Sequence, residues 1–249
     1  MDVLVLRPER AAIRTAEGLR RLGHTPIVAP VLTIEDIPSE IPAQDYQAVL
    51  ATSANGLRKL ARRPEIGRLS RLPLIAVGDR TAEAGREAGF LTIHVAEGDG
   101  RALVAEASRL FSAPARFLHA AGADRAFDVA GALARHGHDV TVIELYRATA
   151  ATALPAAAAA ALGDGEIDAV LHHSRRIAET FLSLSEAAGL GPRVRALGHV
   201  ALSERVAGAL RAVACERVAV APRPDEAALF SALETFAVGV SPSGDGRSK

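Results

Sequence analysis

Two stretches of this chain repeat the same order of apolar and polar residues. One runs from Leu74 to Phe111 and the other from His199 to Phe236, and they align without a gap. Each stretch predicts a strand, a tight turn, a helix and a second strand. A repeat at about half the chain length means two copies of a domain-sized unit, because solenoid repeats are only about 20–50 residues long. The sequence therefore predicts two similar lobes with a cleft between them.

The composition favours a globular protein. With 249 residues and 49% apolar content, the chain suits one large domain or two of about 100–150 residues. The formal net charge is zero and there is no basic run, which argues against nucleic acid as a partner. The chain opens directly into a predicted strand, without a leader peptide, and no apolar run approaches the roughly 18 residues that span a bilayer. Cys215 is the only cysteine, which excludes an internal disulfide and favours a reducing compartment. We therefore expect a cytoplasmic monomer that binds neither nucleic acid nor membrane.

Predicted strands alternate with predicted helices on short connections. This alternation is typical of α/β folds in which parallel sheets are covered by helices on both faces. The proline-bearing stretch from Ile34 to Pro42 cannot lie inside a central strand, so we interpret it as a linker. Residues 239–249 have no apolar period and are expected to form a disordered tail. The strands are expected at residues 3–6, 25–32, 48–53, 74–77, 91–95, 116–120, 140–146, 169–174, 199–202 and 217–221.

The carboxyl ends of the predicted strands are the first place to look for a site, because ligands of open α/β sheets bind there. Ser53 and Ser174 each end a strand just before a predicted helix. A serine in this position caps the helix, and the free N–H groups of the helix start can also bind an anion; both can hold at once. Tyr146 also ends a strand, and a core tyrosine with a satisfied hydroxyl is an equal alternative to a functional one. The full set of strand-end candidates is Arg7, Ser53, Gly78, Gly122, Tyr146, Ser174 and Ser203.

Several common sites are disfavoured. No Gly-x-Gly-x-x-Gly follows the first strand, and the chain has no P-loop motif and no Gly-x-Ser-x-Gly elbow. His172 and His173 look like a pair of metal ligands, but adjacent side chains of a strand point to opposite faces. We expect one buried and one cleft-facing histidine, and no metal site.

Taken in order, these motifs resemble the uroporphyrinogen-III synthase family over about residues 3–237. No single motif is specific, but their order and spacing together are. The matching residues are Arg7-Pro8, Leu22-Gly23-His24 before Pro30, Thr52-Ser53-Ala54-Asn55, Val77-Gly78-Asp79-Arg80-Thr81-Ala82, the Gly122/Arg125 turn, Glu144-Leu145-Tyr146-Arg147 and the strand that ends at Ser174.

The resemblance implies two flavodoxin-like lobes, each with a doubly wound parallel sheet, joined by two extended linkers. Residues 35–148 would form one lobe, and residues 1–34 with 149–238 the other. The chain would cross between them near Ile34 and Arg147.

The resemblance also implies a lyase of haem biosynthesis that uses no cofactor. The reaction is the cyclisation of hydroxymethylbilane, a linear tetrapyrrole, to uroporphyrinogen III, with loss of water and inversion of the last pyrrole ring. Tyr146 matches the family's tyrosine and is the first candidate for a general acid, with Thr81 second. The expected donors to the substrate carboxylates are Arg7, Ser53, Ala54, Asn55, Gly78, Gly122, Arg125, Ser174, Arg175 and Ser203.

Two pairs of residues depart from the family pattern. Ser203 and Val206 stand where the second copy often has glycine and threonine, so a threonine hydroxyl contact is lost there. His172 and His173 replace the more usual aromatic residue or threonine. A different class of function is also open, a non-enzymatic two-lobe cytoplasmic protein that binds a small polyanion.

Overall fold

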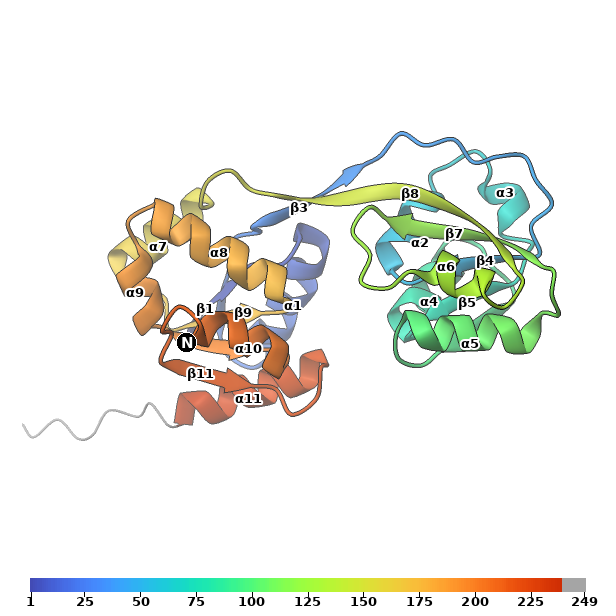
Figure 1. The fold of residues 1–249 in the computed structure, drawn as a ribbon. Helices are drawn as coiled ribbons and strands as arrows, with labels where there is room; N and C mark the ends of the chain where they lie inside the picture. The colour runs from blue at the N-terminus through green and yellow to red at the C-terminus, as the bar shows by residue number, and fades with distance from the viewer. Residues whose placement is uncertain (239–249) are drawn as a thin grey trace, which may run out of the picture. The chain divides into compact units, whose positions relative to one another are not determined.

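In the computed structural model, which describes residues 1–238, contacts divide the chain into two units (Figure 1). The first unit contains Met1–Thr33 and the chain from Thr149 onward, and the second contains Ile34–Ala148. Each unit has its own sheet. The predicted tail, residues 239–249, lies outside the described residues.

The first unit is built on a five-stranded parallel sheet with the order β11-β10-β9-β1-β2. Its strands are β1 (Asp2–Val5), β2 (Thr25–Val28), β9 (Ala169–His172), β10 (Gly198–Ala201) and β11 (Arg217–Val220). Its helices are α1 (Glu9–Arg21), α7 (Ala156–Asp164), α8 (Arg175–Ala187), α9 (Gly191–Ala196), α10 (Glu204–Arg211) and α11 (Glu226–Val238).

Both faces of this sheet are buried. Val3 and Val5 pack in a cluster with residues of α1 and α11, whereas Leu4 and Leu6 pack with residues of α7, α8, α9 and α10. All four side chains are fully buried. Successive side chains of a strand point to opposite faces, so a continuous apolar strand marks a sheet that is covered on both sides.

The second unit is built on a six-stranded sheet with the order β3-β8-β7-β4-β5-β6. From β8 to β6 all neighbouring strands are parallel. α2 and α4 pack on one face of this sheet, and α5 and α6 pack on the other. The elements are β3 (Leu32–Asp36), β4 (Ala48–Ala51), α2 (Ala54–Leu60), α3 (Ile66–Leu69), β5 (Leu74–Val77), α4 (Asp79–Glu87), β6 (Ile93–Ala96), α5 (Gly100–Leu110), β7 (Arg116–Gly122), α6 (Val129–Ala134) and β8 (Asp139–Ala150).

The predicted linker from Ile34 to Pro42 begins with part of a strand. β3 lies at the edge of the sheet beside β8, and the Ile37 N–H donates to the Leu145 carbonyl at 3.0 Å. Nearer the start of β3, the Thr33 hydroxyl donates to the Thr149 carbonyl at 3.4 Å, so the two strands run antiparallel. The prolines lie beyond β3, which is why they do not interrupt it. Part of the stretch interpreted as a linker is therefore an edge strand and not a central one, and β8 continues past Tyr146 to Ala150.

The two repeated stretches adopt corresponding elements. β5, α4, β6 and α5 follow one another in the second unit, as β10, α10, β11 and α11 do in the first. Leu74 pairs with Ile93 and Gly198 pairs with Arg217, so the strand pairs have the same separation along the chain. Among the described residues, no helix has the length and apolar character needed to cross a membrane.

Candidate functional site

Several predicted site residues lie along one edge of the second unit's sheet. Tyr146 lies in β8, Gly122 ends β7, and Ser53 and Gly78 follow β4 and β5. These four strands are consecutive neighbours and run parallel, so their carboxyl ends share one edge. The topology therefore places Gly122, Ser53 and Gly78 at strand ends, whereas Tyr146, predicted to end its strand, lies within β8, which continues to Ala150.

Ser53 caps α2 as predicted. Its hydroxyl oxygen accepts a hydrogen bond from the Asn55 N–H at 3.1 Å. α2 approaches β7 closely, because a Cβ added to Gly56 would lie 2.5 Å from the Ala120 carbonyl oxygen. Only glycine allows this approach, which fixes the start of α2 beside the end of β7. Ala54, in the first turn, is buried.

Gly78 has a left-handed backbone, with φ of +70°, where β5 turns into α4. Its N–H donates to the Ala96 carbonyl at 3.0 Å, and its carbonyl accepts from the N–H groups of Thr81 and Ala82, each at 3.1 Å. Gly78 was predicted to offer its N–H to the substrate, but that donor is used inside the sheet. Thr81 is only 5% exposed, so its side chain belongs largely to the interior.

The ring of Tyr146 lies against Gly122. A Cβ added to Gly122 would lie 2.7 Å from Cζ of the ring, so a larger residue would displace the tyrosine. Burial raises the pKa of the Tyr146 phenol, the hydrogen bond with the Ser53 side chain opposes this rise, and the negative charge of Asp124 adds to it. The phenol is therefore protonated at neutral pH and can donate a hydrogen bond or a proton.

Arg125 is engaged by its own unit. One guanidinium nitrogen donates to the Gly122 carbonyl at 3.0 Å and to the Glu144 carboxylate at 2.7 Å. The ion pair is partly exposed, with 35% of the Arg125 side chain and 42% of the Glu144 side chain accessible. Arg125 was predicted as a carboxylate donor and Glu144 was named only as part of a family motif; the pairing of the two residues was not predicted.

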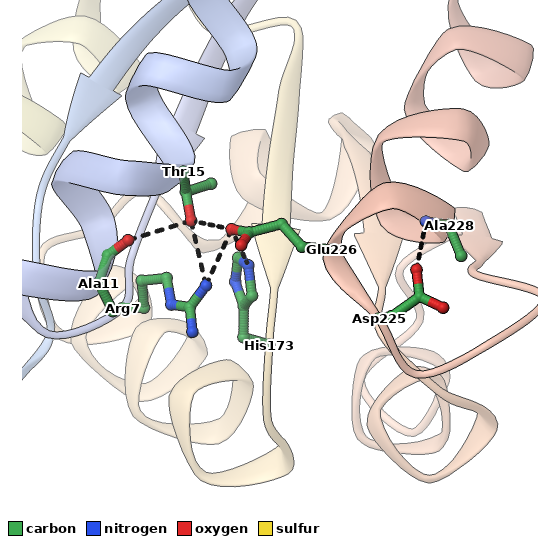
Figure 2. A network of polar contacts seen from close by, with 7 residues as sticks. All are labelled: Arg7, Ala11, Thr15, His173, Asp225, Glu226 and Ala228. Carbon is green, nitrogen blue, oxygen red and sulfur yellow. Dashed lines mark hydrogen bonds and ion pairs between the residues drawn. The ribbon is translucent and has the colours of Figure 1, made fainter. Parts of the chain in front are cut away.

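The first unit gathers a different set of predicted residues at its strand ends. Arg7 follows β1 and donates to the Thr15 hydroxyl at 3.1 Å and to the Glu226 carboxylate at 3.0 Å (Figure 2). The Thr15 hydroxyl also hydrogen-bonds to Glu226, and His173 Nε2 lies 3.9 Å from the same carboxylate. The Arg7 side chain is only 12% exposed. Sequence reasoning missed Thr15 and Glu226, because Glu226 opens a helix that lies far from Arg7 in the chain.

Three predicted residues lie at helix starts of this unit: Ser174 and Arg175 at the start of α8, and Ser203 at the start of α10. Ser174 caps α8 by accepting from the Ile177 N–H at 3.2 Å. Arg175 donates to Glu179 at 2.7 Å within the same helix. Ser203 precedes α10 and makes no side-chain cap. The capping bond predicted for Ser174 is therefore present, and Arg175 pairs within its own helix.

The two adjacent histidines point to opposite faces, as the strand geometry predicted. His172 is fully buried, and its Nε2 lies 3.0 Å from Nδ1 of His199. His173 was expected to face a cleft, but its side chain is only 7% exposed and lies near Glu226. Among the described residues, no group of three or more potential ligands could hold a metal ion.

A groove of about 630 Å³ lies between α8 and α10 of the first unit. Arg175 and Arg205 line it together with Glu179, Glu186 and Glu204, so acidic side chains outnumber basic ones. These carboxylates are partnered within the protein, because Glu179 pairs with Arg175, Glu186 with Arg195 and Glu204 with Arg211. The groove contains one predicted site residue, Arg175.

One family model and several solved structures match this chain. The model of the family described as uroporphyrinogen-III synthase HemD (HEM4) matches residues 13–231. A uroporphyrinogen-III synthetase from Helicobacter pylori is 14% identical, with a TM-score of 0.65 over 95% of this chain and 100% of that one. A mutant uroporphyrinogen III synthase from Thermus thermophilus is 21% identical, with a TM-score of 0.56 over 96% of this chain and 99% of that one. The comparison with curated proteins found no significant match.

The two solved structures are similar to this chain in fold, a mixed α/β fold with parallel sheets. The family model covers most of the chain and includes every predicted site residue except Arg7. This chain belongs to the uroporphyrinogen-III synthase family.

Proposed function

We propose that this chain carries out the reaction of its family, the cyclisation of hydroxymethylbilane to uroporphyrinogen III with loss of water and inversion of the last pyrrole ring. The observation that carries the proposal is the family match over residues 13–231. The match favours this enzyme over a non-enzymatic protein that binds a polyanion.

The reaction depends more on how the protein positions the substrate than on a reactive side chain. A pyrrole nitrogen pushes out the hydroxyl group as water, which leaves an azafulvene. The last ring then attacks through its substituted carbon, and the resulting spiro intermediate fragments and recloses. Without the enzyme the chain closes without inversion, so the protein must hold the substituted carbon as the nearer nucleophile.

A general acid would assist the departure of the hydroxyl group. The Tyr146 phenol is our candidate, because it is protonated and lies at the strand-end edge with Ser53 and Gly122. The tyrosine would regain its proton at the end of the reaction, when the last ring loses a proton and becomes aromatic again. General acid catalysis of this kind contributes about 10²–10⁴-fold. Thr81 remains the second candidate, although its burial weakens the case.

The substrate carboxylates need hydrogen-bond donors at the strand ends. Helix starts with free N–H groups suit them, which supports the backbone around Ser53 and Ala54, and around Ser174. The Asn55 N–H donates to the Ser53 hydroxyl and would have to exchange that bond for one with the substrate. Gly122 and Ser203 also lie at strand ends. The three candidate arginines already contact carboxylates of this chain: Arg7 contacts Glu226, Arg125 contacts Glu144, and Arg175 contacts Glu179. To bind the substrate, each arginine would have to contact a substrate carboxylate in addition to that partner or in place of it.

We also propose that the two units are flavodoxin-like lobes that arose by duplication. The order β2-β1-β9-β10-β11 in one sheet corresponds to β8-β7-β4-β5-β6 in the other, which supports a doubly wound sheet in each lobe. The division of contacts after Thr33 and after Ala148 supports lobes of residues 1–34 with 149–238 and of residues 35–148. A cleft between the lobes, a monomeric state and a cytoplasmic location belong to the same proposal.

Incubation with hydroxymethylbilane tests the function. The purified protein should form the type III isomer of uroporphyrinogen, which chromatography separates from the type I isomer of the spontaneous reaction. A product that contains only type I, at the rate seen without protein, would refute the proposal.

A further inference from the structure

A bulge in β8 sets the direction of the Tyr146 side chain. Ala121 pairs with Glu144 and Gly122 pairs with Tyr146, so Leu145 is an extra residue in β8 opposite β7. In a regular strand, Leu145 and Tyr146 would point to opposite faces. Here both pack against the same core, under α2 and α4, with Leu145 buried and Tyr146 partly buried. The bulge therefore turns Tyr146 toward that face, which is a common use of bulges beside active sites.

Glycine at position 122 makes room for the turned ring. The Cβ that any other residue would carry at Gly122 would lie 2.7 Å from Cζ and 2.9 Å from the hydroxyl oxygen of Tyr146. The Ala123 N–H donates to the Tyr146 carbonyl at 2.9 Å, so pairing of the two strands resumes directly after the bulge. The phenol thus lies over the last residue of β7.

Arg125 spans the bulge from one strand to the other. Its guanidinium contacts the Gly122 carbonyl on β7 and the Glu144 carboxylate on β8, and these two residues stand on either side of the irregular step. Glu144 is also fixed from its other side, because the Ser39 hydroxyl donates to its carbonyl at 2.6 Å. The ion pair therefore ties together the two backbone segments whose offset directs Tyr146.

We propose that Arg125 and Glu144 are positioning residues, which hold the bulge of β8 and thereby keep the Tyr146 ring and hydroxyl over Gly122. They act through the tyrosine and need no contact with substrate. The inference rests on the proposed function for its kinetic consequences only, since the position of the ring can be measured without any reaction.

The kinetic test is a graded pair of substitutions at Glu144. Glu144→Ala removes the partner of Arg125 and should lower kcat about tenfold while KM changes less than about twofold, because a misplacement of about 1 Å can cost up to about 10²-fold. Glu144→Gln keeps an oxygen that can accept from Arg125 and should lie between the wild type and Glu144→Ala. If Arg125 instead bound the substrate, freeing it from Glu144 would lower KM and leave kcat unchanged, which would overturn the proposal.

A double-mutant cycle separates an action through Tyr146 from a general loss of structure. In a Tyr146→Phe protein, Glu144→Ala should lower kcat no further, because the group that it positions has already gone. Full additivity of the two effects would overturn the proposal. Asp139→Asn is the matched control, since Asp139 pairs with Arg116 at 3.0 Å across the same two strands at their other end. It should leave kcat unchanged.

The second test follows the ring itself. The chain has two tyrosines and no tryptophan, so ring-labelled Tyr146 can be observed alone by NMR in a Tyr46→Phe protein. Glu144→Ala should shift and broaden its ring signals, Glu144→Gln should do so less, and Asp139→Asn should not. Unchanged signals in both Glu144 variants would overturn the proposal. If the wild type forms no type III isomer, the proposed function fails, but this measurement still decides whether the ion pair positions the ring.

Discussion

At position 146, phenylalanine would fill nearly the same space as tyrosine and would lack only the hydroxyl group. Its proton is retained at neutral pH because burial raises the pKa of the phenol. We expect Tyr146→Phe to lower kcat by about 10²-fold or more, the range for loss of a general acid. Its free energy of unfolding should change by only about 1 kcal/mol, the net value of one hydrogen bond.

Steady-state kinetics and urea unfolding of Tyr146→Phe check both halves of this expectation. Thr81→Val serves as the comparison, because it removes the second candidate hydroxyl. A Tyr146→Phe enzyme with wild-type turnover would exclude the phenol from the mechanism.

A buried histidine makes the second unit sensitive to acid. His119 lies in β7, is 1% exposed, and neither of its ring nitrogens has a hydrogen-bond partner in the described part of the chain. Burial, with a smaller contribution from the charge of Arg125, lowers its pKa to about 4. The unfolded chain binds this proton near pH 6.5, so stability is fully present above that pH and is lost as the pH falls toward 4.

We expect His119 alone to lower the free energy of unfolding by about 2 kcal/mol between pH 7 and pH 5. Urea unfolding of the wild type and of His119→Leu at both pH values measures this, since the variant should lose less stability on acidification by about that amount. Equal losses in the two proteins would mean that His119 titrates normally in the folded state.

Among the helices and strands, α2 depends most directly on the absence of a side chain at Gly56. A Cβ at Gly56 would meet the Ala120 backbone, which cannot move without disturbing the centre of the sheet. Gly56→Ala should therefore lower the free energy of unfolding by about 1–3 kcal/mol, the range for overpacking.

Gly208→Ala in α10 is the control for this helix substitution. Nothing lies within 4 Å of a Cβ at Gly208, so alanine should raise stability by about 0.5–1 kcal/mol through helix propensity. Thermal unfolding of both variants gives the comparison. A neutral Gly56→Ala would show that α2 can shift away from β7 at little cost.

The helices and strands also show which features of the fold can be predicted from the sequence. Apolar periodicity located most strands, and capping residues such as Ser53 and Ser174 located helix starts, because both depend on near neighbours. The edge strand β3 escaped, since its partner β8 lies far away in the chain. Glu226 escaped for the same reason, as its contact with Arg7 is set by packing and not by spacing.

At the scale of the whole molecule, the second unit is continuous in sequence and has a core on each face of its sheet. A fragment of residues 32–150, which includes β3 and all of β8, should therefore fold alone and unfold in one cooperative step. Circular dichroism with urea checks this. A fragment without a cooperative transition would show that this unit needs the rest of the chain.

The second unit interrupts the first in sequence, and this interruption affects the order in which the protein can fold during synthesis. β1 pairs with β9, and the whole of the second unit lies between them in the sequence. During synthesis, β1 therefore cannot pair with β9 until the second unit has been translated. Domains tend to fold as units while the chain emerges. The first unit can therefore complete its sheet only after the second unit has been made. Until then β1 and β2 can pair only with each other, and their apolar residues lack the later strands and helices that bury them in the finished protein.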